Sequence, residues 1–306
     1  MKWKIFAFAK INRFLWVGTR DPTGYHPLVT FFQTVALWDE ITLRCLQPDG
    51  PFEVRWTIDP AVGLDPEATT LAQAVRRLVE GRTPRLTGVW HIRLRKQIPI
   101  AAGLGGGSAD AAALLMALNE IWGLGLSVSE LHEHARAIGM DVPFFLYGGR
   151  ALAGGYGDRV WPLPDDTSAE EWFVLWVPPE RAVTRVMYQR LDVVRPEAPV
   201  RPDVLTLLDT PTRLAAALEE AANDFVPVIE TTWPEGAAWK ERLRRLGAHP
   251  VQWSGSGLAL WGRFTHAYEA WRAYQALQAA RPPGTFGAVV PALSRRAWRA
   301  YIRLRA

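Results

Sequence analysis

The chain has 306 residues, of which 49% are hydrophobic and 22% charged, a composition typical of a globular protein with one large or two medium domains. Its single cysteine, Cys45, excludes an internal disulfide and a cysteine-based zinc site. No apolar run approaches the roughly 18 residues of a membrane span, so we expect a soluble, cytoplasmic protein without a membrane partner. The net charge is +4, but the basic residues are scattered, and we expect no nucleic-acid partner. The densest basic cluster consists of Arg295, Arg296, Arg299, Arg303 and Arg305, which we interpret as the solvated face of a terminal helix.

The first half of the chain combines strand patterns with helix patterns. Residues 70–79 place their apolar side chains on one helical face. A second helix is predicted from about Ser108 to Trp122, and a third begins at Ser127, which forms a capping box with Glu130, and ends at Gly139. Apolar and polar residues alternate, as in strands, at residues 3–8, 15–17, 30–37, 40–46, 52–58 and 90–94.

A polar, proline-containing segment at residues 162–171 is the best candidate for a domain boundary. We therefore expect one domain over residues 1–162 and a second over residues 163–306. Strands mixed with helices in both parts predict an α+β fold of two domains. Beyond the boundary, strands are predicted at 172–177, 251–253 and 258–261, and helices at 213–222, 237–246 and 265–280.

A glycine-rich loop lies between the strand at 90–94 and the helix after it. Glycines without Cβ atoms let backbone N–H groups approach a ligand closely, and the helix adds unpaired N–H donors and a partial positive charge. A bound anion is therefore expected here. Four of five consecutive positions are glycine in the loop, which consists of Gly103, Leu104, Gly105, Gly106, Gly107 and Ser108.

Two common phosphate motifs are excluded by the context of this loop. A Walker A loop requires a Gly-Lys pair, and the chain contains none. A dinucleotide-binding fingerprint requires glycine where Ser108 stands, and an acidic residue closing a second strand about 20 residues later. Glu130 has that spacing, but it opens a helix.

Lys10 and Asp141 are the candidate catalytic residues. Phosphoryl transfer to a hydroxyl requires an orienting carboxylate or base and a cation near the transferring group. Either residue alone would be ordinary, since an isolated lysine is usually on the surface and an aspartate just after a helix is often a turn or cap residue. Together with the glycine loop they form a constellation.

Five blocks in order along the chain carry a resemblance to the galactokinase–homoserine kinase–mevalonate kinase–phosphomevalonate kinase superfamily. Within it, the chain most resembles the kinases of 4-diphosphocytidyl-2-C-methyl-D-erythritol, which serve non-mevalonate isoprenoid synthesis. The glycine loop marks the superfamily, and the first two blocks narrow the resemblance. The blocks are Ala9-Lys-Ile-Asn12, Gly24-Tyr-His26, Pro99 to Ala112, Asp141-Val-Pro-Phe144 and Ser254-Gly-Ser-Gly257.

The resemblance implies an active site in a cleft between two domains, where the γ-phosphate of ATP passes to the 2-hydroxyl of the methylerythritol. Asp141 would be the base, and Lys10 would favour its charged form and stabilise developing charge. Asn12 would help to hold the hydroxyl end. The glycine loop would bind the phosphates, and Ser108 is a possible contact of Mg²⁺.

The resemblance also implies a site for the cytidine of the substrate. Tyr25 would stack on the cytosine, and His26 or backbone groups would read its edge. Tyr188 would be a second aromatic on the other face of the base, although an ordinary core position is the alternative. The segment Ser254, Gly255, Ser256 and Gly257 would close over the substrate phosphates, with a simple turn as the alternative.

The chain departs from the family pattern at Arg13, Thr23, Thr70, Ala109 and Leu258. Arg13 would add a charge near the site, and the other departures concern affinity rather than chemistry. The rival interpretations are another kinase of the superfamily, of mevalonate or homoserine type, and a non-catalytic nucleotide-binding relative. The sequence does not indicate an oligomeric state.

Overall fold

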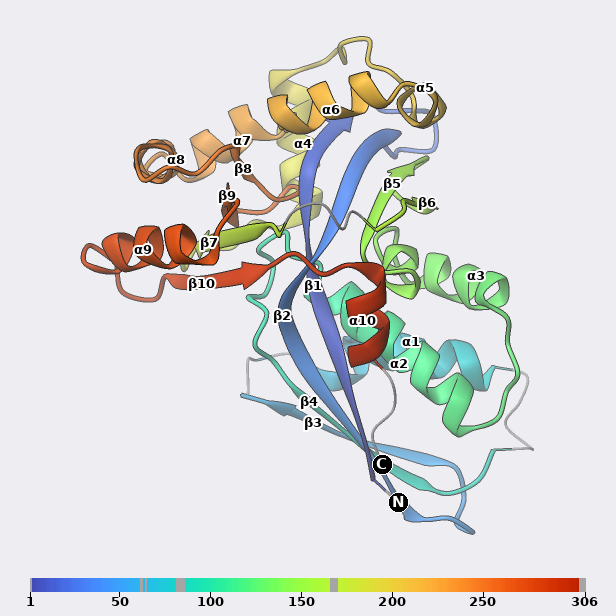
Figure 1. Ribbon diagram of the computed structural model, residues 1–306. Coiled ribbons are helices and arrows are strands. Elements are labelled where there is room, and N and C mark those ends of the chain that lie inside the picture. The colour runs from blue at the N-terminus through green and yellow to red at the C-terminus, as the bar shows by residue number, and fades with distance from the viewer. Residues whose placement is uncertain (1, 61–62, 64, 81–85, 166–169, 303–306) are drawn as a thin grey trace.

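A pair of long antiparallel strands organises the molecule, whose computed structural model describes residues 2–60, 63, 65–80, 86–165 and 170–302. β1 (Lys2–Val17) and β2 (Leu28–Gln47) run from the end where β3 and β4 lie to the end where α5 and α6 lie (Figure 1). The sequence predicted two short strands in place of each, which is wrong. Register shifts between Phe8 and Lys10 and between Asn12 and Phe14 bend β1 without ending it, and its buried polar residues had masked the alternation.

A six-stranded mixed sheet forms around this pair. Its order is β3-β4-β2-β5-β6, with β1 paired to β2, and only the β3–β4 pair is parallel. The predicted strands at 52–58 and 90–94 are confirmed as β3 and β4, while β5 and β6 had not been predicted. The remaining bounds are β3 (Glu53–Asp59), β4 (Val89–Arg95), β5 (Arg150–Gly154) and β6 (Arg159–Pro162).

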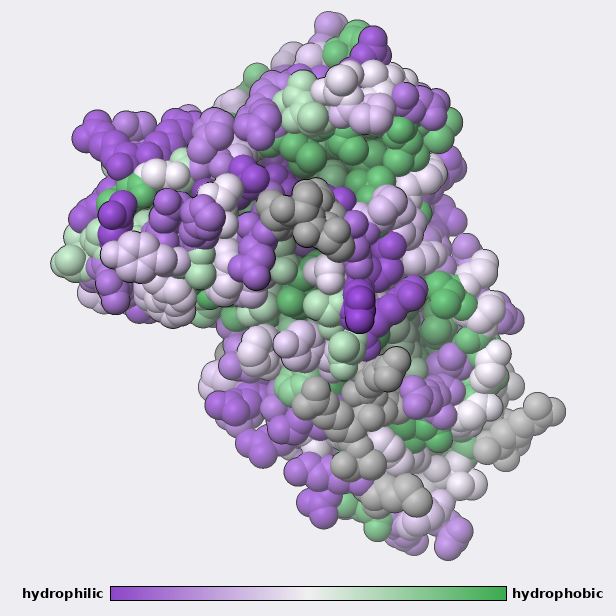
Figure 2. All heavy atoms as spheres, viewed as in Figure 1, coloured by the Kyte–Doolittle hydropathy of each residue, from purple (hydrophilic) through white to green (hydrophobic). Residues whose placement is uncertain are grey.

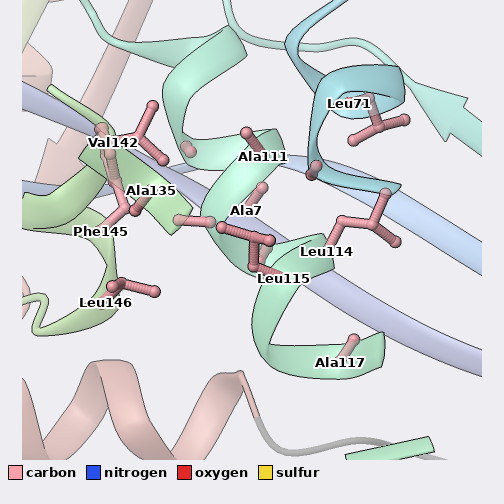
Figure 3. Packing of buried hydrophobic residues seen from close by; sticks show 14 of the residues in the cluster. Ala7, Leu71, Ala111, Leu114, Leu115, Ala117, Ala135, Val142, Phe145 and Leu146 are labelled. Atoms are coloured by element: carbon pink, nitrogen blue, oxygen red, sulfur yellow. The ribbon is translucent and has the colours of Figure 1, made fainter. Parts of the chain in front are cut away.

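Three predicted helices cover one face of this sheet and are confirmed. α1 (Thr70–Val79) has the predicted bounds, α2 is Gly106–Ile121, and α3 is Val128–Ile138 with the predicted capping box. Figure 3 shows side chains of α2 reaching toward α1 and toward the short helix η3 (Val142–Leu146). This packing fixes both the start of α2 and the start of η3, where the candidate residues lie.

The second sheet has four antiparallel strands in the order β10-β7-β9-β8. Predicted elements that are confirmed are β7 (Trp172–Val177), β8 (Val251–Trp253), β9 (Leu260–Phe264), α6 (Pro211–Glu220), α8 (Gly236–Arg245), α9 (Ala267–Gln278) and the terminal helix α10 (Arg295–Tyr301). Elements that had not been predicted are α4 (Thr184–Val194), α5 (Val204–Asp209), α7 (Val226–Thr232), β10 (Phe286–Pro291) and the short helix η1 (Pro66–Ala68).

The predicted boundary falls between the two sheets, since β6 ends the first and β7 begins the second. The division into domains stays a prediction, because β1 contributes to the cores on both sides. Leu15 and Val17 pack with Val174 and Trp176 of β7, whereas Ile5 packs with the helices of the first sheet. Of the predicted basic cluster, Arg303 and Arg305 lie outside the described residues.

The surface is mostly polar on the face seen in Figure 2, and apolar residues gather on it near α5 and α6. None of the helices in the described part of the chain has the length and apolar character needed to cross a membrane.

Candidate active site

A cavity of about 1010 Å³ collects most of the residues predicted from the sequence. β1, β2, the glycine loop, the turn before η3 and one face of α4 contribute to its walls. Of the predicted residues, those that line it are Lys10, Asn12, Tyr25, His26, Gly103, Leu104, Gly105, Gly106, Gly107, Ser108, Asp141, Tyr188, Gly255 and Ser256. Ser254 and Gly257 are not among them.

The glycine loop takes a backbone conformation that only glycine adopts easily. Gly105 is the N-cap of α2 with φ +71°, and Gly103 has φ +88°. A Cβ on Gly103 would lie 2.0 Å from the carbonyl oxygen of Ser254. The cap residue offers no side-chain hydrogen bond to the first turn of α2, so amide groups of that turn remain for an anion at the cavity wall.

Ser254 and Gly257 support this loop from behind. The hydroxyl of Ser254 accepts from the backbone N–H of Asn12 at 3.1 Å and donates to the carbonyl of Gly103 at 2.8 Å. A Cβ on Gly257 would lie 2.1 Å from the carbonyl carbon of Ala102. The two backbone segments are therefore in direct contact, and only Gly255 and Ser256 of the predicted segment reach the cavity.

Lys10 and Asp141 meet at the wall of the cavity. Nζ of Lys10 lies 3.3 Å from Oδ2 of Asp141 and donates to Oδ1 of Asn12 at 2.6 Å. The amide of Asn12 in turn donates to the hydroxyl of Thr30 at 2.8 Å. The lysine side chain is 3% exposed and the aspartate side chain 38%, so the ammonium is held in place while the carboxylate remains open to a ligand.

Asp141 is the N-cap of η3, but its side chain makes no capping hydrogen bond. Its backbone thus occupies the turn before η3, but its carboxylate does not cap the helix. The turn is fixed instead by Pro143 in the first turn of η3 and by the buried Val142 and Phe144. The carboxylate is thus placed by packing and is free for a role in the cavity.

Aromatic residues line the other end of the cavity. Tyr25 is 54% exposed, and its ring centroid lies 5.3 Å from that of Tyr156. His26 is buried, and its ring lies 5.0 Å from that of Tyr188. Burial, and then the charge of Asp141, raise the pKa of Tyr188 above its ordinary value. Both predicted aromatics, Tyr25 and Tyr188, therefore face one space.

Sequence reasoning missed a buried charge cluster beside the glycine loop. Nζ of Lys96 lies 2.9 Å from Oδ2 of Asp110 and also bonds Asp39. Burial raises the pKa of Asp110 to about 8, against the lowering effect of Lys96. Lys96 and Asp110 line the cavity. The position of Asp110, two residues after Ser108, could have pointed to this cluster. Asp39 is distant in sequence, so no local pattern linked it to the glycine loop.

Two of the departures from the family pattern acquire a structural reason. Arg13 is absent from the cavity lining and pairs instead with Glu171 at 2.9 Å, which Arg263 also contacts at 2.6 Å. The expectation that it adds a charge near the site is therefore wrong, because its side chain leaves β1 on the other side from Asn12. Thr70 lines the cavity and donates to the carbonyl of Gly107 at 2.6 Å, so it braces the loop.

The part of the chain that the structure describes contains no group of three or more His, Cys, Asp or Glu side chains arranged to hold a metal ion. Single oxygen donors do face the cavity near the loop, on Ser108 and Asp110. Oδ1 of Asp110 is buried without a hydrogen-bond partner among the described residues. This donor set fits an ion such as Mg²⁺, which keeps several waters and takes most of its remaining ligands from nucleotide phosphates.

Comparison with known proteins gives consistent results. Residues 69–149 match the family model "GHMP kinases N terminal domain". The chain is 35% identical over 284 residues, 91% of its length and 93% of the relative's, to a 4-diphosphocytidyl-2-C-methyl-D-erythritol kinase of Geobacillus kaustophilus.

Solved structures agree with this result. A crystal structure of 4-(cytidine 5'-diphospho)-2C-methyl-D-erythritol kinase superposes with a TM-score of 0.72 at 30% identity, covering 94% of this chain and 98% of the other. The L. major mevalonate kinase superposes with a TM-score of 0.69 at 15% identity, covering 95% and 96%, a likeness of fold alone. The predicted α+β mixture of helices and sheets is thus the fold of these kinases.

Proposed function

The chain belongs to the 4-diphosphocytidyl-2-C-methyl-D-erythritol kinase family and is an ATP-dependent kinase; from this premise we propose that it phosphorylates the 2-hydroxyl of that substrate, with Asp141 and Lys10 as its catalytic residues. The observation that carries the proposal is the contact of 3.3 Å between Lys10 and Asp141 in the cavity that also contains the glycine loop and Tyr25. The sites for the ATP phosphates, for phosphoryl transfer and for the cytosine then lie in one continuous space.

ATP is held by its phosphates at the start of α2. The amide groups of Gly103 to Ser108 and the helix N-terminus bind the phosphates, and Thr70 and Ser254 fix the loop that presents them. A loop set by backbone contacts needs little rearrangement when charge develops, which is the condition for electrostatic catalysis.

In the transfer step, the 2-hydroxyl oxygen of the substrate attacks the γ-phosphorus of ATP. A new P–O bond forms, the bond between the γ-phosphorus and the β–γ bridging oxygen breaks, and ADP leaves. Asp141 accepts the proton of the hydroxyl. Lys10 stabilises the carboxylate before transfer and the negative charge between hydroxyl and phosphate during it, while Asn12 orients the lysine at 2.6 Å.

Mg²⁺ accompanies ATP in this proposal. Ser108 is its proposed protein contact, with Asp110 two residues further along α2 as a second oxygen donor at the cavity wall. When bound, the ion would neutralise phosphate charge.

The cytidine end of the substrate binds between Tyr25 and Tyr188 in this proposal. Both rings line the cavity, and an aromatic face stacks on a pyrimidine independently of hydrogen-bond reading. Gly255 and Ser256 contact the diphosphate, and Ser254 and Gly257 act behind them. A cytoplasmic location and the absence of a nucleic-acid partner remain predictions.

The test is an assay of purified protein with MgATP and 4-diphosphocytidyl-2-C-methyl-D-erythritol, in which ADP release is measured. We expect turnover with this substrate and none with mevalonate or homoserine. The reverse pattern would show that the chain is a different kinase of the superfamily.

Asp141→Asn tests the proposed base. The amide retains the shape of the side chain but cannot accept the hydroxyl proton as readily, so we expect kcat to fall about 10³-fold while the Kd of ATP stays the same. Near-normal turnover would remove Asp141 from the role of base.

A further inference from the structure

One contact lies at the end of the cavity where the cytosine is proposed to bind, and none of the roles proposed above involves it. Nε2 of His26 lies 3.2 Å from Oδ1 of Asp192, a residue near the end of α4. Nδ1 of the same ring lies 3.0 Å from the carbonyl oxygen of Gly18. The histidine side chain is buried, whereas the aspartate is 34% exposed and lines the cavity. The ring is therefore held from two sides by oxygen atoms.

These two partners hold the imidazole in one orientation. Each ring nitrogen lies within hydrogen-bond distance of one oxygen atom: Nδ1 faces the carbonyl of Gly18, and Nε2 faces the carboxylate of Asp192. Rotation of the ring would break both bonds. Both nitrogens therefore have a partner within the protein, and together the two contacts orient the ring.

Helix α4 contacts the imidazole twice. Tyr188 precedes Asp192 by four residues, so the two side chains lie on the same face of the helix. The ring centroids of Tyr188 and His26 lie 5.0 Å apart. On its other contact, the ring of Tyr188 packs edge to face with Phe225, at a centroid distance of 4.8 Å. One helix thus fixes the face of the imidazole with an aromatic ring and its edge with a carboxylate.

A second cavity of about 290 Å³ adjoins this place. Arg20, His26 and Asp192 line both this space and the main cavity. The contact between His26 and Asp192 is therefore part of the wall between two spaces. Without the carboxylate, the ring would have room to turn out of the main cavity.

We propose that Asp192 is a positioning residue for recognition of the pyrimidine nucleoside diphosphate, acting by holding the imidazole of His26 against Tyr188. The inference rests on the proposed function, because it takes the space beside Tyr25 and His26 as the base site. Asp192 belongs to α4, whereas Lys10 and Asp141 belong to β1 and the start of η3. Its removal should consequently weaken substrate binding and leave the transfer step intact.

The experiment is steady-state kinetics of Asp192→Asn with each substrate varied in turn. We expect KM for 4-diphosphocytidyl-2-C-methyl-D-erythritol to rise about tenfold, with kcat and the KM for ATP within about twofold of the wild type. Asp192→Glu, which keeps the carboxylate, should recover part of the affinity. The matched control is Glu197→Gln, the same change of charge at an exposed residue just beyond α4, which should leave all constants unchanged.

A double-variant cycle separates action through His26 from a general structural effect. If Asp192 acts through the imidazole, adding Asp192→Asn to His26→Gln should raise KM no further than His26→Gln alone. An unchanged KM in Asp192→Asn, or effects of the two changes that simply multiply, would overturn the inference. Absence of turnover in the wild type would instead overturn the proposed function, so the two failures are distinguishable.

Discussion

The two ends of the cavity are held together by different kinds of contact. The transfer end contains Lys10 and Asp141, and the base end, where the cytosine is proposed to bind, contains Tyr25 and Tyr188. At the transfer end, backbone groups and buried polar side chains hold the proposed catalytic residues: Lys10 is 3% exposed, and Ser254 joins two backbone segments. At the base end, the exposed Tyr25 and the half-buried Tyr188 are held by side chains from distant parts of the chain. The first arrangement suits a reaction that tolerates little displacement. The second suits binding, so changes there should act on KM rather than kcat.

The sharpest test of this comparison is Lys10→Met, which removes the ammonium from the transfer end. We expect kcat to fall about 10³-fold, because the charge that stabilises the developing negative charge is lost, with a smaller change in KM. The control is Lys4→Met on the same strand, where the lysine is 41% exposed and pairs with Glu40 at 3.0 Å. A kcat within tenfold of the wild type would break the comparison, because the transfer end would then not depend on its central charge.

Gly257→Ala tests whether backbone contact fixes the transfer end. The added Cβ would lie 2.1 Å from the carbonyl carbon of Ala102, so one segment must move. We expect the free energy of unfolding in urea to fall by about 3 kcal/mol, and the Kd of ATP to rise as the glycine loop shifts. Gly139→Ala is the control, since its Cβ would lie 3.4 Å from Val142, an ordinary contact. If Gly257→Ala and Gly139→Ala were equally stable, close backbone contact at Gly257 would not be what fixes the transfer end.

The sequence identified residues that meet at one end of the cavity, because they lie in contiguous motifs. Lys10 and Asn12 are two residues apart, and the glycine loop is a single run. The helix that follows the loop is predicted by the spacing of its apolar residues. The residues that complete the base end lie on α4, a helix that the sequence pattern did not predict. Its spacing is weak because only Met187 and Leu191 are buried along it.

Two long-range pairs at the cytidine end of the cavity were not predicted, for a related reason. Asp192 meets His26 across 166 positions and Tyr156 meets Asp21 across 135, and no local pattern records such pairings. The continuity of β1 was also missed, because its polar residues face a cavity rather than solvent and interrupt the alternation. The prediction of β1 therefore failed where polar side chains line the cavity, as expected where a site requires residues that a regular strand pattern would not contain.

Lys240→Met examines the support behind the transfer end, since Lys240 packs on Trp253 of β8, the strand that leads to Ser254. Burial, and then the charge of Arg244, lower the pKa of Lys240 to about 8, with Glu230 opposing. In the unfolded chain the value is about 10.4. Between these values the unfolded state binds more protons, so the stability of the wild type rises with pH from about 8 to about 10.

Below pH 8 the folded wild type therefore contains a buried charge at a cost, which methionine removes. We expect Lys240→Met to be about 2 kcal/mol more stable than the wild type in urea unfolding at pH 7, with this advantage shrinking toward pH 10. The exposed Lys2, replaced by methionine, is the control. An advantage that does not change with pH would show that packing on Trp253, and not the charge, sets the difference.

Tyr156→Phe gives the smallest expected effect and addresses the base end alone. The phenol of Tyr156 donates to Oδ2 of Asp21 at 2.6 Å and lies 3.3 Å from the hydroxyl of Thr23. These contacts attach the turn that carries Tyr25 to the hairpin of β5 and β6. Hydrogen bonds from Thr23 and then Tyr156 lower the pKa of Asp21, so the carboxylate remains charged and accepts both.

Loss of this one hydroxyl keeps the ring that packs on Tyr25, so we expect KM for the cytidyl substrate to rise about threefold while kcat and the KM for ATP stay constant. Tyr147→Phe is the matched control: its phenol also makes a hydrogen bond, at 3.1 Å to His132, but it is not part of the cavity lining. If Tyr156→Phe lowers kcat instead, the turn must also position the hydroxyl end of the substrate. The two ends would then be mechanically coupled, since a substrate held at its cytidine would be placed for transfer by the same contacts.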